Sequence, residues 1–311
     1  MSLFTNEKHY NTLNNYYLHK YGKKVFKVSL NGGFTCPNID GTVSFGGCTF
    51  CSSMGSGEFA GNKYDPLKKQ FDDVKEMMHQ KWPEAYYIPY FQANTNTHGP
   101  VSRLKELFEE AITLDPNIVE LSIATRPDSL PNDVVEYLSE LNTRIPVQVE
   151  LGLQTIHDDI AKDLNRGHDL KTFDDAVKRL RKENIEVVVH IINGLPNETK
   201  EMMLDTIRHL NTLDIQGVKI HMLNILSNSK MGQAYLKEPW PILSRKEYID
   251  IVTTQIRLLR KDIIIHRLTG DGKFDKLIEP KWIMRKFTVL NDIDKVLRAN
   301  KWYQGDLYEK E

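Results

Sequence analysis

The stretch NGGFTCPNIDGTVSFGGCTFC, residues 31–51, contains all three cysteines of the chain: Cys36, Cys48 and Cys51. Eleven residues separate the first two cysteines and two residues separate the last two. Three thiolates this close together can bind one metal centre, and the flanking glycines let the backbone wrap tightly around it. With no fourth cysteine in 311 residues, such a centre needs another kind of ligand or keeps an open coordination position.

The cysteines by themselves leave three interpretations open: a zinc ion completed by a histidine, an iron–sulfur cluster, or unligated thiols. An odd number of cysteines, without an apolar segment at the N-terminus, argues against a disulfide framework and a signal peptide. We therefore expect a cytoplasmic protein. No membrane span is expected either, because the most apolar run, residues 185–192, is too short to cross a bilayer.

Short β-rich runs alternate with amphipathic segments along most of the chain. The predicted strands are 25–30, 86–92, 118–124, 147–153, 185–192 and 218–223, and the predicted helices are 66–82, 101–114, 132–141, 171–183 and 198–213. A continuous apolar run such as 185–192 is typical of a parallel strand buried on both faces. The pattern predicts an α/β fold, a partial (β/α)6 TIM-like barrel with its functional groups at the C-terminal strand ends, and a doubly wound sheet is the alternative.

The chain is expected to divide into a core barrel, residues 1–243 including a basic N-terminal segment, and a C-terminal α/β extension, residues 244–311. In the extension we predict a helix at 244–259, an apolar run at 263–268 and a tail that packs on the barrel. Trp282 and Trp302 of this tail are interpreted as packing residues. Pro131 and Pro196 are predicted to mark helix starts.

The cysteine loop resembles that of radical S-adenosylmethionine (SAM) enzymes, including an aromatic residue, Phe50, before the last cysteine. These enzymes most often have three residues between the first two cysteines, and the longer spacing here is similar to that of the branch with the Elongator catalytic subunit. Five further motifs resemble the YtqA/YhcC-type group of this superfamily. They are FQANTNT (91–97), TRPDSLP (125–131), ELGLQT (150–155), NGLPNET (193–199) and IHRLTGDG (265–272).

This resemblance implies a partial radical SAM barrel with a [4Fe–4S] cluster on Cys36, Cys48 and Cys51. One iron would chelate SAM, whose reductive cleavage gives a 5′-deoxyadenosyl radical, with flavodoxin or ferredoxin as electron donor. Gln154 and Arg166 are expected to contact SAM, since a guanidinium can pair with its carboxylate. Further cofactor contacts are expected from Phe50, Gln92, Asn94, Thr95, Asn96, Thr125, Glu150, Gly194, Leu195 and Asn224, with Glu150 replacing a glutamate that relatives carry at the position of Ala124.

The resemblance also implies a tRNA substrate, whose wobble uridine side chain would be trimmed from 5-carboxymethylaminomethyl to 5-aminomethyl (the MnmL activity). Two basic flanks are predicted to clamp the anticodon loop. Their residues are Lys20, Lys23, Lys24 and Lys27 at one end and Arg267, Lys273, Lys281, Arg285 and Lys286 at the other. The alternatives are a radical SAM oxidoreductase acting on a small molecule such as a tetrapyrrole precursor, a non-catalytic tRNA- or haem-binding module, and a zinc-stabilised structural protein.

Overall fold

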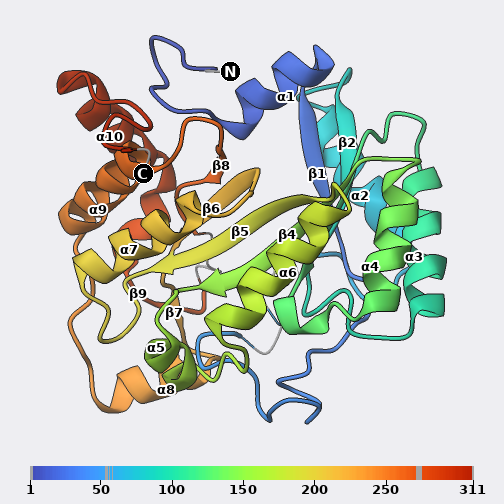
Figure 1. The fold of residues 1–311 in the computed structure, drawn as a ribbon, viewed down its shortest axis with the longest axis horizontal. Coiled ribbons are helices and arrows are strands. Elements are labelled where there is room, and N and C mark those ends of the chain that lie inside the picture. Colours follow the sequence, from blue (N-terminus) through green and yellow to red (C-terminus); the bar gives the residue numbers. More distant parts are fainter. Residues whose placement is uncertain (1–2, 53–54, 56, 58, 271–274, 310–311) are drawn as a thin grey trace.

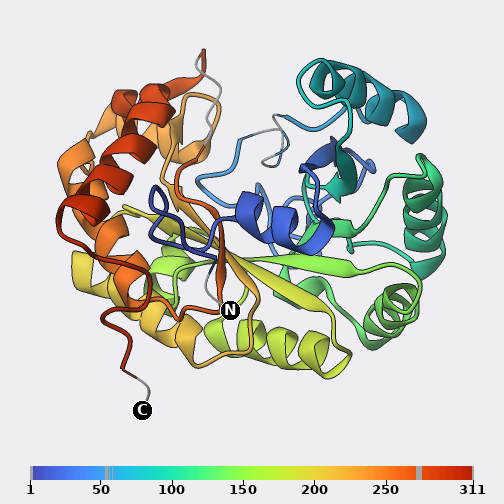
Figure 2. The same cartoon turned by 90° about the horizontal axis from the view of Figure 1, so that it is seen from above.

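The computed structural model describes residues 3–52, 55, 57, 59–270 and 275–309. Within these residues, seven parallel strands form one sheet, in which spatial neighbours follow one another in chain order. The sheet curls into an open half-barrel with helices on its outer face (Figure 1, Figure 2). The strands are β1 (Val25–Leu30), β2 (Tyr86–Phe91), β3 (Leu121–Thr125), β4 (Val147–Gln154), β5 (Glu186–Asn193), β6 (Gly217–Met222) and β8 (Ile264–Arg267).

Amphipathic helices connect the strands and bury one face each against the sheet. They are α2 (Leu67–His79), α3 (Val101–Thr113), α4 (Asn132–Asn142), α6 (Leu170–Lys182) and α7 (Lys200–Asn211). On α3, Leu104, Leu107 and Phe108 recur at helical spacing and are buried, and the Phe108 ring lies 4.9 Å from that of Phe91 on β2. Burial of each such side chain contributes about 1.5–3 kcal/mol to the free energy of folding.

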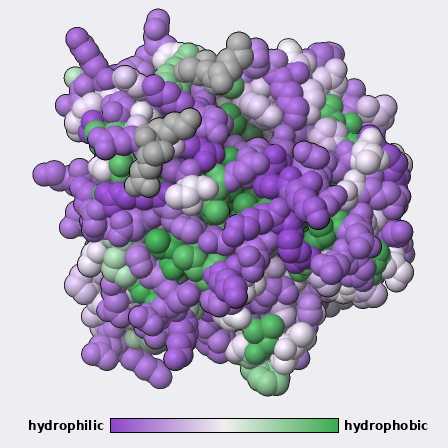
Figure 3. Space-filling view, viewed as in Figure 1, coloured by the Kyte–Doolittle hydropathy of each residue, from purple (hydrophilic) through white to green (hydrophobic). Residues whose placement is uncertain are grey.

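The remaining elements lie at the two ends of the chain and around the C-terminal strand ends. They are α1 (Leu13–Tyr21), α5 (Asp158–Asp163), α8 (Lys230–Lys237), α9 (Arg245–Leu258), α10 (Lys286–Ala299), the short antiparallel pair β7 (Ile225–Leu226) and β9 (Leu277–Glu279), and the 3-10 turns η1 (Pro127–Ser129) and η2 (Lys281–Arg285). The face shown in Figure 3 is mainly hydrophilic, with hydrophobic residues exposed in separate patches. No helix in the described part of the chain has the length and apolar character to span a bilayer.

The six predicted strands are confirmed, with ends shifted by three residues or fewer. The largest shift is at β3, because Ile118 makes only an isolated bridge with Tyr87. The apolar run 263–268, predicted to be part of an extension, forms β8 and pairs in parallel with β6 as a seventh strand. The sheet therefore runs across the predicted boundary at residues 243/244, and the division into two domains stays a prediction.

One of the two predicted helix starts is correct. Pro131 is the N-cap residue of α4. Pro196 instead lies in a turn, and α7 begins four residues later, where the Thr199 hydroxyl accepts a hydrogen bond from the Met202 amide at 3.3 Å. A hydroxyl at the N-cap satisfies an amide that otherwise has no partner, which decides the helix start here.

The N-terminal segment closes the N-terminal end of the half-barrel. The Ile265 amide of β8 donates to the carbonyl of Asn11 at 2.8 Å, and α1 then runs across this end of the half-barrel toward β1 (Figure 1, Figure 2). The prediction that the N-terminal basic flank forms half of an RNA clamp is therefore wrong. Lys20 pairs with a buried glutamate, Lys27 lies inside the barrel, and residues 23 and 24 precede β1, at the end of the sheet opposite the cysteine loop.

Part of the C-terminal basic flank shares a cavity with the cysteines. Arg267, Arg285 and Lys286 line the same cavity as the cysteine loop. Lys281 donates to a backbone carbonyl of β9, and Lys273 lies outside the described residues. Both tail tryptophans pack, partly buried, against the hydrophobic core.

Candidate active site

One large cavity extends along the inside of the half-barrel and reaches the cysteine loop. Its volume of about 1030 Å³ lies at the upper end of the range of roughly 300–1,000 Å³ that ligand pockets span. All seven strands of the sheet, or the loops that follow them, contribute to its wall. The fold therefore brings residues from the whole chain to one site with room for more than one ligand.

Most of the predicted site residues line this cavity. They are Cys36, Cys48, Phe50, Cys51, Gln92, Asn94, Thr95, Thr125, Glu150, Gln154, Arg166 and Asn224. Asn96, Gly194 and Leu195 do not line it. The Asn96 side chain is fully buried and donates to the carbonyl of Ala124 at 2.8 Å, while Leu195 is part of the hydrophobic core.

Two consecutive glycines shape the cysteine loop. Gly46 and Gly47 have φ values of 76° and 75°, a left-handed conformation that favours glycine. The Gly47 amide donates to the carbonyl of Asn38 at 2.7 Å, and the Thr49 amide donates to that of Leu164 at 2.9 Å. These bonds hold the second and third cysteines against the segment that follows α5.

The surroundings of Cys48 favour its thiolate form. A hydrogen bond with Cys51 lowers the pKa of the Cys48 thiol to about 7, with help from Arg126 and Asn38, although burial opposes the shift. The Asn38 amide nitrogen lies 3.5 Å from the Cys48 sulfur. The thiolate is the form of cysteine that binds metals, so the electrostatics of this loop suit a metal centre.

The chemistry of the donor set fits an iron–sulfur cluster. All three cysteines are half-buried on the wall of one cavity, and a single ion would need their sulfurs about 2.3 Å from one point. Among the described residues, no three His, Cys, Asp or Glu side chains converge on such a point. A four-iron cluster places each cysteine on a different iron, so it does not require that convergence.

The end of β4 carries a strained residue that faces the cavity. Gln154 has a φ of 63°, and the pairing register between β4 and β5 shifts between Gly152 and Gln154. A Cβ atom at Gly152 would lie 2.7 Å from the side-chain nitrogen of Gln154, so the glycine makes room for this amide. Strain of this kind in a non-glycine residue is common at ligand sites, which supports the prediction that Gln154 binds a ligand.

Arg166 is fully buried and holds the same strand end in place. Its Nη1 donates to the carbonyls of Leu153 and Thr155, both at 2.6 Å, and its Nη2 contacts Asp158 at 3.1 Å. Its carbonyl accepts a hydrogen bond from the Asn38 amide at 2.9 Å, which ties it to the cysteine loop. Arg166 therefore connects the end of β4 to the cysteines, and contact with a SAM carboxylate stays a prediction.

The polar motif after β2 also supports the cysteine loop. The Asn94 side chain donates to the carbonyl of Phe34 at 3.0 Å, and its backbone amide donates to that of Gly55 at 2.9 Å. The Thr95 amide donates to the carbonyl of Thr35 at 3.2 Å. The loop after β2 is thus bonded to the chain on both sides of the cysteines.

Glu150 is the centre of a buried charge cluster deeper in the cavity. Its carboxylate pairs with both Lys27 and Lys219. The Tyr90 hydroxyl donates to it at 2.7 Å, and the His190 Nε2 lies 2.6 Å away. Burial alone would raise the pKa of Glu150, but the two ammonium groups and His190 hold it well below its usual range. Its expected contact with SAM stays a prediction, because these protein groups already occupy the carboxylate.

Sequence reasoning missed the strand residues that extend this cluster. They are His190 of β5, Lys219 and His221 of β6, and His266 of β8. The available signal was a polar residue at every second position of an otherwise apolar strand, as in β6, because side chains two residues apart share a face. This signal alone did not place these residues inside the barrel, because the sequence does not show which face of a strand points inward.

Glu198, in the loop after β5, is a second carboxyl group that sequence reasoning missed. Burial raises its pKa to about 8, and its Oε2 has no hydrogen-bond partner among the described residues. In the unfolded chain the pKa of a glutamate is about 4.3. The buried carboxyl group of Glu198 therefore lowers the free energy of unfolding progressively as pH rises from about 4 to 8.

Replacing Glu198 with glutamine is therefore expected to stabilise the protein increasingly across that pH range. The gain should reach a few kcal/mol above pH 8, at about 1.4 kcal/mol for each unit of pKa shift. Urea denaturation at a series of pH values measures it, with the exposed Glu238→Gln as the control. A stability difference that does not vary with pH would contradict the prediction.

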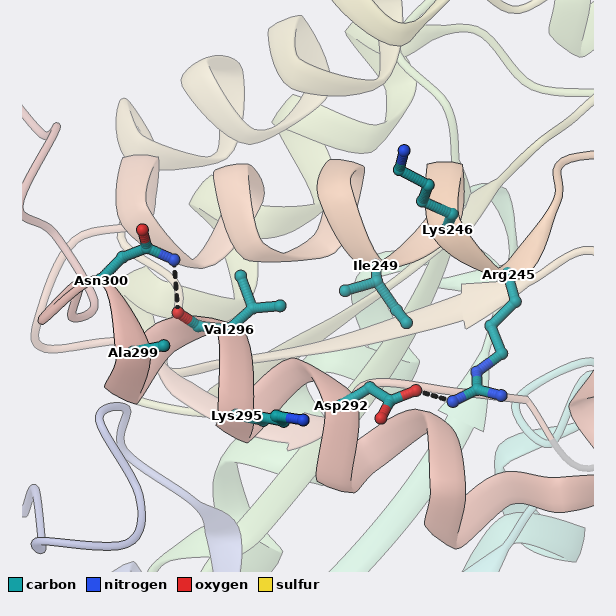
Figure 4. A pocket seen from close by; sticks show the side chains of 8 residues that line it. All are labelled: Arg245, Lys246, Ile249, Asp292, Lys295, Val296, Ala299 and Asn300. Atoms are coloured by element: carbon teal, nitrogen blue, oxygen red, sulfur yellow. Dashed lines mark hydrogen bonds and ion pairs between the residues drawn. The ribbon is translucent and has the colours of Figure 1, made fainter.

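A second cavity, of about 580 Å³, lies between α9 and α10 (Figure 4). Arg245 pairs with Asp292 across it, and the Asn300 side chain donates to the carbonyl of Val296 at 2.9 Å. It shares no lining residue with the cysteine cavity, and its described wall has no cysteine or histidine. We therefore place the active site in the first cavity.

Comparison with known proteins finds matches along most of the chain. A profile described as the Radical SAM superfamily matches residues 43–210, and one described as the Radical_SAM C-terminal domain matches residues 215–299. The chain is 49% identical to the uncharacterized protein YtqA of Bacillus subtilis, over 98% of this chain and 94% of that protein. It is 32% identical to protein YhcC of Escherichia coli K12, over 90% of each chain.

More distant matches cover part of a longer protein. A tRNA uridine(34) acetyltransferase of Methanocaldococcus jannaschii is 24% identical over 55% of this chain and 31% of its own length. The solved structure of archaeal Methanocaldococcus infernus Elp3 covers 90% of this chain and 64% of its own, with a TM-score of 0.67 and 15% identity. The latter similarity confirms the fold predicted from the sequence.

Proposed function

Since this chain belongs to the radical SAM superfamily, we propose that it is a tRNA-modifying member that converts 5-carboxymethylaminomethyluridine at the wobble position to 5-aminomethyluridine. Its cofactors are a [4Fe–4S] cluster and SAM, which when bound supply a 5′-deoxyadenosyl radical that abstracts a hydrogen atom from the substrate. The observation that carries the proposal is the single cavity that joins the cysteine loop to the polar interior of the barrel.

The chain's own residues hold and orient these groups. Cys36, Cys48 and Cys51 would hold the cluster through their thiolates. Gln154 offers both an amide donor and an amide acceptor to SAM, and Arg166 keeps it in position by holding the end of β4. The barrel wall around them limits the access of bulk water to the reacting atoms.

Residues at the edge of the cavity support an RNA substrate. Phe59 and Phe287 line the cavity although 57% and 78% of their surfaces are exposed, and the exposed Arg285, the last residue of η2, lines it too. Exposed aromatic rings and a cationic side chain on one cavity wall suit unstacked bases and phosphates of a single-stranded loop. The M. jannaschii relative is named as an acetyltransferase of tRNA uridine 34, which points to the same substrate class.

Nucleoside mass spectrometry of tRNA from a strain that lacks this gene tests the proposal. We expect 5-carboxymethylaminomethyluridine to accumulate at the expense of 5-aminomethyluridine and of nucleosides made from it. A plasmid with the wild-type gene should restore the profile, and one with Cys48→Ala should not. An unchanged profile in the deletion strain would reject the tRNA assignment and favour a small-molecule substrate.

A further inference from the structure

The interior of the half-barrel is lined by polar and charged side chains, whereas apolar branched side chains usually fill the inside of such barrels. Lys27 of β1, Glu150 of β4 and Lys219 of β6 lie together there, and we call these three residues the interior cluster. All three line the cavity that reaches the cysteine loop. A polar lining that continues from the cysteines into the barrel indicates that a ligand enters it.

The interior cluster has more cations than anions. Lys27 and Lys219 share the carboxylate of Glu150, which is their only acidic partner in the part of the chain that the structure describes. Glu150 is also the only acidic side chain among the described residues of the cavity wall. Burial lowers the pKa of Lys219 to about 7 although Glu150 opposes the shift. An anionic ligand would therefore stabilise the charged form of this buried lysine.

Buried polar atoms without a hydrogen-bond partner line the same cavity as the interior cluster. The Nε2 atom of His221 and the Nδ1 atom of His266 are buried without a hydrogen-bond partner among the described residues, and both side chains line the cavity. The Oδ1 atom of Asn224, whose side chain also lines the cavity, is likewise buried without a hydrogen-bond partner among the described residues. Buried polar atoms normally have partners, so a polar ligand is the natural complement of these three.

The interior cluster lies at a useful depth below the cofactor end of the cavity. Glu150 precedes Gln154 by four residues on β4, which at about 3.3 Å per residue corresponds to roughly 13 Å. The carboxymethylaminomethyl side chain spans only about 6 Å from the base to its carboxylate. A base held between the levels of Gln154 and Glu150 would therefore bring that carboxylate to the two lysines.

We propose that the interior cluster binds the carboxylate of the substrate's side chain. This rests on the proposed function, in which the carboxymethyl group is the part that the substrate has and the product lacks. Lys27 and Lys219 attract the carboxylate of the substrate. The side chains of substrate and product both carry a cationic amine, but the product lacks the carboxylate. Its attraction to the two lysines is therefore lost, so the cluster favours product release.

The test measures binding of two labelled anticodon stem-loops to the anaerobically reconstituted holoenzyme without reductant, by fluorescence anisotropy. One RNA carries 5-carboxymethylaminomethyluridine and the other carries 5-aminomethyluridine. We expect the wild-type protein to bind the RNA with 5-carboxymethylaminomethyluridine about 10- to 100-fold more tightly than the RNA with 5-aminomethyluridine, as a charge-assisted contact allows. Lys219→Met and Lys27→Met should each remove most of this difference, while the affinity for the aminomethyl RNA does not fall.

Two variants are used because a substitution inside the barrel can prevent folding. Each variant leaves Glu150 with the other lysine as a partner. Lys23→Met, which removes a surface lysine outside the cavity, is the matched control and should keep the wild-type preference. The cluster absorbance verifies that each variant is loaded. A preference retained in both cavity variants would overturn the proposal.

The free nucleoside 5-carboxymethylaminomethyluridine separates this inference from the proposed function. If it binds as tightly as the RNA and loses affinity in Lys219→Met, the carboxylate site is supported and the RNA substrate is not. If the wild-type protein binds neither RNA nor the nucleoside, the proposed function and the inference both fail.

Discussion

Replacing Cys48 with alanine is expected to abolish the iron–sulfur cluster and reduce SAM cleavage to the background of the assay. The chain has only three cysteines, so no other thiolate can replace the lost ligand. Cys48 is also the cysteine whose pKa is lowered to about 7 by its hydrogen bond with Cys51, which favours metal binding near neutral pH. The measurements are visible absorbance after anaerobic reconstitution and 5′-deoxyadenosine formation with dithionite.

Thr49→Ser is the matched control for this experiment. It changes a residue of the same loop, whose contacts to Leu164 and Met231 are made by backbone atoms, so cluster and activity should stay near the wild-type level. Wild-type absorbance and 5′-deoxyadenosine formation in Cys48→Ala would show that the loop is not the cluster site. A colourless wild-type protein with one zinc ion per chain would lead to the same conclusion.

Replacing Glu150 with glutamine is expected to destabilise the protein by about 3–5 kcal/mol, the usual cost of removing one member of a buried ion pair. The substitution keeps the size of the side chain but leaves Lys27 and Lys219 buried without an anionic partner. Chemical denaturation of the purified protein at neutral pH measures the change. The pKa of Glu150 is depressed, so its contribution is present above the unfolded value near 4.3 and is lost only as pH falls through the lower folded value.

The exposed Glu110→Gln serves as the control for this second prediction. A surface substitution of this kind usually changes the free energy of unfolding by no more than about 0.5 kcal/mol. If Glu150→Gln were equally mild, the two lysines would have to lose their charge in the variant. The ion pairs with Glu150 would then contribute little to the stability of the fold.

Much of the fold followed from local patterns in the chain. Continuous apolar runs such as residues 185–192 identified the strands, and the helical spacing of Leu104, Leu107 and Phe108 identified the buried face of α3. β8 was recognised as an apolar run but not as part of the sheet. Its partner, β6, is more than forty residues earlier in the chain, and pairing between distant strands leaves no local signal.

The same division applies to the site. The spacing of Cys36, Cys48 and Cys51, with the motifs at the strand ends, was sufficient to predict a cluster-binding loop, because those residues are close in sequence or recur at strand ends. The roles of Lys27 and Glu150 were decided only by the tertiary structure. Lys27 belongs to a basic segment by sequence, yet β1 turns it into the barrel, where it meets a carboxylate from β4. Which face of a strand points inward, and what lies opposite, depends on how the whole sheet curves, and the sequence of one strand does not contain that information.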